Sequence, residues 1–108
     1  MKTLVRDLKR AGVPLDGVGV QAHETVGFVP PLADIRRNLE ELAALGVELA
    51  ITELDVKFPA LPPTRAGLVQ QRRDYETIVR ACADVPRCVG VTVWDWTDKV
   101  SARLATQI

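Results

Sequence analysis

Two carboxylates, Glu53 and Asp55, stand two residues apart near the end of the apolar stretch "VELAITELDVKF". His23 ends a second stretch of this kind, "GVGVQAH", and Trp94 with Trp96 ends a third, "RCVGVTVWDW". Carboxylate and imidazole groups act as nucleophiles or transfer protons, and tryptophan rings suit stacking against sugars. Polar strand ends also occur simply because they meet solvent, and tryptophans often serve as core packing. The coincidence at three stretches favours a functional site.

The apolar pattern predicts an α/β fold in which helices and strands alternate. Helices are expected at residues 3–12, 32–46 and 68–83, and strands at residues 17–23, 47–56 and 87–96. Strands joined by helical crossovers form a parallel sheet with right-handed connections. In such sheets ligands bind at the carboxyl ends of the strands, which is where the polar residues fall.

The two longer helices should each present an apolar side. Leu32, Ile35, Leu39 and Leu42 recur at helical spacing in the first, and Leu68, Tyr75, Val79 and Cys82 share one side of the second. Asp34 is expected to cap the start of helix 32–46, and Gly46 to end it.

Strand alternation predicts which side chains share a face. One face of the first strand should hold Val18, Val20 and Ala22, and the other Gln21 and His23. Leu49, Ile51, Glu53 and Asp55 are expected on one face of the second strand. In the third strand, Val89, Val91 and Val93 should lie opposite Trp94 and Trp96.

The composition excludes several classes of protein. The 108 residues carry 47% hydrophobic residues and a formal net charge of zero, so nothing marks a nucleic-acid or anionic-membrane partner. No apolar run reaches the roughly 20 residues of a membrane span, and the start "MKTLVRDLKRAG" does not resemble a signal peptide. We expect residues 1–108 to form one unit.

Two interpretations of Cys82 and Cys88 are open. They are either small buried residues or a short-range disulfide. Their spacing excludes a C-x-x-C motif, and two cysteines with one distant histidine make a poor zinc set, so we expect no metal site.

Three motifs together resemble a known family. "PLDGVGVQAH", "ELAITELDV" and "RCVGVTVWDWTDKVS", in this order, look like strands six, seven and eight of glycoside hydrolase family 10, the endo-1,4-β-xylanases with a (β/α)₈ barrel. The resemblance covers roughly residues 4–101. It implies that residues 1–108 are the C-terminal part of such a catalytic domain, a partial barrel.

The resemblance also implies roles for individual residues. Glu53 matches the nucleophile of a retaining hydrolase, and His23 and Asp55 match residues that support it. Gln21 and Trp94 match substrate-binding positions. The family acts on β-1,4-xylan or xylo-oligosaccharides without a cofactor. A disulfide between Cys82 and Cys88, as in some members, would fit secretion.

The chain departs from the family pattern in several places. Asp95 and Trp96 replace a glycine and an apolar residue, and Ala102 stands where a second tryptophan is usual. The family's acid/base glutamate follows an asparagine, and the dipeptide Asn-Glu does not occur here; Asp98 is expected to lie in a loop. We expect the isolated chain to hydrolyse xylan very weakly or not at all.

Two alternatives stay open beside a partial xylanase. One is a non-catalytic remnant or assembly half with weak sugar binding, and the other is an unrelated small α/β module. A three-stranded parallel piece has open edges, so we expect the isolated chain to be marginally stable, or to associate with itself or with a complementary barrel fragment.

Overall fold

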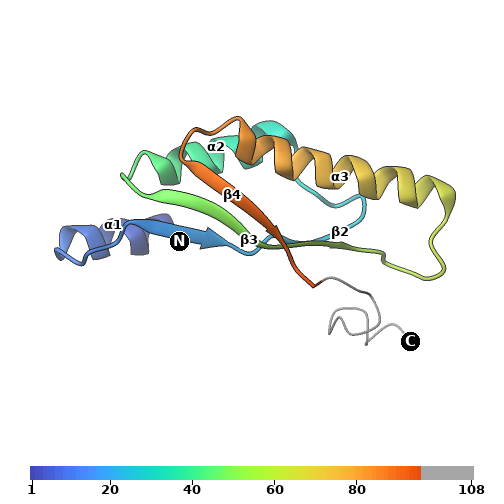
Figure 1. Cartoon of the computed structure of the whole chain (residues 1–108), viewed down its shortest axis with the longest axis horizontal. Helices are drawn as coiled ribbons and strands as arrows, with labels where there is room; N and C mark the ends of the chain where they lie inside the picture. Colours follow the sequence, from blue (N-terminus) through green and yellow to red (C-terminus); the bar gives the residue numbers. More distant parts are fainter. Residues whose placement is uncertain (96–108) are drawn as a thin grey trace.

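The computed structural model describes residues 1–95 (Figure 1). Its elements are, in chain order, α1 (Lys2–Arg10), β1 (Gly17–Val20), β2 (His23–Thr25), α2 (Leu32–Ala43), β3 (Glu48–Lys57), α3 (Arg65–Ala83) and β4 (Cys88–Val93). The alternation of helices and strands is confirmed. The expected strand 17–23 is wrong in one respect, because it is divided into β1 and β2. Trp96, Asp98 and Ala102 lie outside the described residues.

β3 is the central strand of a parallel sheet. β1 pairs with its first half, from Gly17 opposite Glu48 to Val20 opposite Ile51. β2 pairs with its last three residues, beginning with His23 opposite Asp55. β4 also pairs with β3 in parallel and reaches no further than the register of Leu54. All the carboxyl ends therefore point the same way.

An irregularity in β3 corrects the predicted faces. Between Ile51 and Asp55, β3 contains one residue more than the segment of β1 and β2 that pairs with it. The register with β4 also shifts between Ile51 and Leu54. This bulge changes the phase of the alternation. Leu49 and Ile51 are therefore buried with Leu54 and Val56, whereas Glu53 and Asp55 lie off that face. The prediction that Leu49, Ile51, Glu53 and Asp55 share one face is wrong.

Helices α2 and α3 cover one face of the sheet (Figure 1). The core lies between them and β3, and its fully buried side chains include Val47, Leu49, Ile51 and Leu54. Burying one such side chain contributes about 1.5–3 kcal/mol.

The buried side of α3 differs from the predicted one. It consists of Asp74, Ile78, Ala81 and Cys82, at helical spacing. Of the predicted set, Cys82 is buried and Tyr75 packs against the core, whereas Leu68 and Val79 are exposed. The predicted set followed apolar residues, but the true stripe begins with an aspartate.

The helix ends are set by local chemistry. The Thr64 hydroxyl accepts a hydrogen bond from the Gly67 amide at 3.0 Å and caps α3. The predicted Asp34 cap is wrong: Pro31 is the N-cap of α2, and Asp34 lies in the first turn, where it pairs with Arg37 at 2.6 Å. Gly46 ends the α2 region as expected, with a φ of +79° that favours glycine.

β1 and β4 form open edges within the described part of the chain. A second register shift, next to Val89, and the edge position leave Val89 and Val93 exposed, so the predicted apolar face of this strand is wrong for these two residues.

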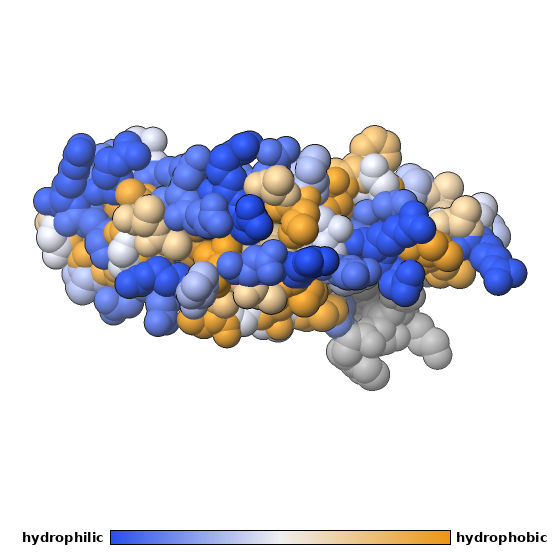
Figure 2. Space-filling model, turned by 90° about the horizontal axis from the view of Figure 1, so that it is seen from above, coloured by the Kyte–Doolittle hydropathy of each residue, from blue (hydrophilic) through white to orange (hydrophobic). Residues whose placement is uncertain are grey.

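Seen from the helix side, hydrophilic side chains cover much of the surface, with hydrophobic areas between them (Figure 2). The radius of gyration of 15.6 Å exceeds the roughly 13 Å of a compact 100-residue domain, because the molecule is elongated, with extents of 49 × 27 × 20 Å.

A disulfide joins Cys82, near the end of α3, to Cys88, the first residue of β4. It closes the short connection between the two elements, and both half-cystines pack in or against the core. The structure thus pairs the cysteines as the family resemblance implied. Within residues 1–95, no helix is long and apolar enough to cross a membrane.

Candidate active site

His23 lies between two carboxylates at the carboxyl ends of the strands. Its Nε2 is 3.1 Å from Oε2 of Glu53, within hydrogen-bond distance. Its Nδ1 is 3.1 Å from Oδ2 of Asp55, a close contact without the alignment of a hydrogen bond. The exposed fractions of the side chains are 22% for His23, 25% for Glu53 and 15% for Asp55. The three residues predicted from the sequence are therefore brought together in a partly shielded cluster.

The backbone that carries this cluster departs from regular strand geometry. Ala22 has a φ of +65°, an uncommon left-handed conformation for a residue with a Cβ. The Glu53 and Asp55 amides still donate to the Gln21 and Ala22 carbonyls, at 3.1 and 3.3 Å. The break between β1 and β2 thus lies directly beside the bulge in β3. Such irregularities re-aim side chains, and here they turn Glu53 off the core face.

Trp94 joins the cluster from the end of β4. Its ring centroid lies 5.9 Å from that of His23 in an edge-on arrangement, and 43% of the residue is exposed. The next residue, Asp95, is the other non-glycine residue with a positive φ among those described, at +58°. An indole that is half exposed and fixed at one edge can present apolar surface to a ligand.

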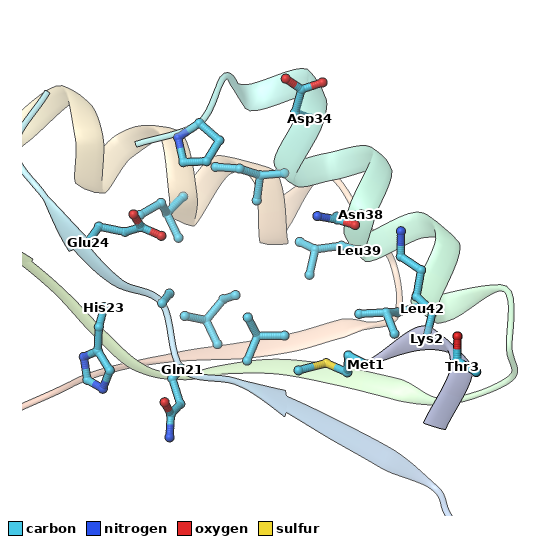
Figure 3. Close-up of a pocket in the computed structure, with 16 residues that line it drawn as sticks. Met1, Lys2, Thr3, Gln21, His23, Glu24, Asp34, Asn38, Leu39 and Leu42 are labelled. Atoms are coloured by element: carbon cyan, nitrogen blue, oxygen red, sulfur yellow. The ribbon is translucent and has the colours of Figure 1, made fainter. Parts of the chain in front are cut away.

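Gln21 and His23 point away from α2, whereas Glu24 points toward the helix side (Figure 3). Gln21 and His23 therefore share a face, as the sequence predicted. The hollow in that view, about 750 Å³, lies between the start of α1, α2 and the backbone around Ala22. It is mostly on the helix side and is lined by apolar residues such as Leu39 and Leu42. Gln21 and His23 are among its lining residues, whereas Glu53, Asp55 and Trp94 are not.

The cluster suits nucleophilic or acid–base chemistry. The imidazole of His23 can donate from Nε2 to Oε2 of Glu53 and so orient that carboxylate, while its Nδ1 lies beside Asp55. Within residues 1–95, no group of His, Cys, Asp and Glu side chains is arranged to hold a metal ion. What the geometry offers is a carboxylate held through Oε2 by His23, whose ring also lies edge-on to the half-exposed indole of Trp94.

Sequence reasoning missed one buried charge, which is bonded to the turn that follows β2. Asp74 of α3 is 5% exposed, and its carboxylate accepts hydrogen bonds from the Gly27 amide and the Gln70 side chain, both at 2.8 Å. Its position four residues before the buried Ile78, inside the packed stripe of the helix, is the signal that could have revealed it.

Comparisons with known proteins identify the relationship. The model of glycosyl hydrolase family 10 matches residues 1–107. An endo-1,4-beta-xylanase from Agaricus bisporus is 56% identical over 101 residues, which are 94% of this chain and 29% of that protein. Endo-1,4-beta-xylanase A from Phanerodontia chrysosporium is 56% identical over 98 residues, 91% of this chain and 23% of that protein.

Solved structures agree with the sequence relatives. The GH10 xylanase from Bispora sp. MEY-1, solved with xylobiose, superimposes with a TM-score of 0.92 and 38% identity over 97% of this chain and 31% of that one. These neighbours are (β/α)₈ barrels, so the sheet and its helices form part of such a barrel. The chain spans less than a third of the length of these relatives. It belongs to glycosyl hydrolase family 10.

Proposed function

We propose that this chain supplies the nucleophile to a retaining endo-1,4-β-xylanase, as strands six to eight of the catalytic barrel. The observation that carries the proposal is the Glu53 carboxylate, held by His23 at the carboxyl ends of parallel strands in a family 10 chain. The first of these barrel strands corresponds to β1 with β2, the second to β3 and the third to β4.

The proposed reaction proceeds through a covalent intermediate. Because His23 engages Oε2 of Glu53, Oε1 is free of that bond to attack the anomeric carbon. The glycosidic C–O bond breaks, and the leaving oxygen takes a proton from a second carboxylic acid. That group then takes a proton from water, which attacks the anomeric carbon and releases Glu53 with retained configuration.

The second carboxyl must lie about 5–5.5 Å from Glu53 in a retaining enzyme. Asp55 does not suit this role, since its carboxylate faces His23 at 3.1 Å. We assign the acid/base to the part of the barrel outside this chain, which fits the share of the relatives that the chain spans. His23 and Asp55 support the nucleophile: His23 orients Glu53, and Asp55 orients His23.

The proposed substrate is β-1,4-xylan or a xylo-oligosaccharide. The names of the curated relatives and the xylobiose in one structural neighbour support this choice. Trp94 would form an aromatic wall of the sugar subsite at the cleaved bond, and Gln21 would hydrogen-bond nearby. No cofactor is required for this chemistry, and the family relationship favours a secreted protein.

A chimera tests the proposal. The matching segment of the Agaricus bisporus xylanase is replaced by this chain, and xylan hydrolysis is measured. We expect activity that Glu53→Gln abolishes, because an amide cannot form the glycosyl intermediate. Glu48→Gln, an exposed position at the start of the same strand, is the matched control and should retain activity. Loss of activity in both variants or in neither, from folded protein, would refute the role of Glu53.

A further inference from the structure

β3 extends beyond the end of β4, which pairs with the edge of β3 opposite β1 and β2. The last β4 pairing joins Leu54 to Val93, but β3 continues to Lys57. The backbone of Asp55 and Lys57 faces β2, through the bonds from the Asp55 amide to Ala22 and from Val26 to the Lys57 carbonyl. The amide and carbonyl of Val56 between them therefore point the other way, past the end of β4.

Among the described residues, side chains of α3 take the place of a strand partner at Val56. The Val56 amide donates to the Tyr75 hydroxyl at 3.2 Å, and Gln71 Nε2 donates to the Val56 carbonyl at 2.8 Å. Both polar groups of this buried residue are thus satisfied by one helix. Val56 directly follows Asp55, so these two bonds fix the backbone from which Asp55 projects.

Asp74 fixes the end of β2. Its Oδ2 accepts from the Gly27 amide at 2.8 Å, in the turn closed by the bond from Phe28 to Thr25. Gly27 has a φ of +81°, which few other residues adopt. β2 has only three residues, and a short two-stranded extension is weakly stable by itself. The carboxylate therefore anchors the segment that begins with His23.

We propose that Gln71, Asp74 and Tyr75, which we call the α3 brace, position His23 and Asp55 against Glu53. A buried carboxylate is costly unless it is hydrogen-bonded, and Asp74 accepts bonds from the Gly27 amide in a loop and from the neighbouring Gln70 side chain. This inference rests on the proposed function, and it makes Asp74 a positioning residue rather than a catalytic one.

The ring of His23 offers a direct readout, because it is the only histidine in the chain. We would record its ¹H–¹³C resonances in the full chain, together with the rate at which an activated 2-fluoro-xylobioside labels Glu53. Asp74→Ala should displace the His23 resonances and slow labelling by about tenfold or more, since misplacement by 1 Å can cost about 100-fold. Asp74→Asn should restore much of both, because its amide oxygen can still accept from Gly27.

Two further variants make the test decisive. Glu76→Ala, an exposed acidic position on the same helix, should change neither readout. Tyr75→Phe removes only a hydroxyl and should move both readouts in the direction of Asp74→Ala; it decides the matter if Asp74→Ala does not fold. Native resonances and native labelling in Tyr75→Phe and in folded Asp74→Ala would overturn the proposal. If the unsubstituted chain is not labelled, the proposed function fails, but the His23 resonances still test the brace.

Discussion

Removal of the His23 ring should slow the first chemical step without unfolding the sheet. The His23–Glu53 bond spans 3.1 Å, and both side chains are about one quarter exposed. A hydrogen bond to a charged group contributes about 1.5–3 kcal/mol. Partial solvent screening places this one near the lower value. Since about 1.4 kcal/mol corresponds to a factor of ten in rate, His23→Ala should slow the step roughly tenfold.

The assay measures the rate at which the activated 2-fluoro-xylobioside labels the His23→Ala chain and the unsubstituted chain. Labelling is monitored by intact-mass spectrometry. His23→Gln, which can still donate one hydrogen bond, should lose less. Circular dichroism establishes that the variants remain folded. A His23→Ala rate within twofold of the unsubstituted rate would refute the reasoning, since it would mean that the observed contact does not orient the nucleophile.

Further predictions concern the scaffold. Leu54→Ala should destabilise the chain by about 2–5 kcal/mol in urea unfolding, because Leu54 is fully buried beside the bulge. Replacing Cys82 and Cys88 by serine should cost about 2 kcal/mol in the same measurement, from the entropy of a loop with sequence separation 6. The Lys2 ammonium beside Glu41 holds the pKa of that carboxyl below its usual value. The stability from this exposed pair should be present above the usual pKa and lost as the pH falls through the lowered one, so Glu41→Gln should flatten the acid limb of the stability curve. The open β1 and β4 edges predict association that increases with concentration in size-exclusion chromatography.

The element types could be predicted because apolar periodicity dictates them. The sequence also carries a signal of the bulge. The buried positions are Leu49 and Ile51, then Leu54 and Val56, and the change from odd to even numbers marks the inserted residue. A reading that assumed unbroken alternation missed it. The break at Ala22 has no such signal, because alanine rarely adopts a positive φ.

That the candidate site residues lie near one another was predictable, but their contacts were not. His23, Glu53, Asp55 and Trp94 stand at strand ends, and parallel pairing alone brings strand ends together. Which groups are in contact depends on the bulge. The α3 brace could not be foreseen, because the need for it arises only where β4 ends three residues before β3 does.

The most direct test of Glu53 as the nucleophile is peptide mapping of the chain after reaction with the activated 2-fluoro-xylobioside. This reagent carries a leaving group that needs no acid, so it reports on the nucleophile alone. We predict a stable adduct on the peptide that contains Glu53, and none in Glu53→Gln. An adduct on another residue, or no adduct from demonstrably folded chain at saturating reagent, would contradict the assignment of Glu53.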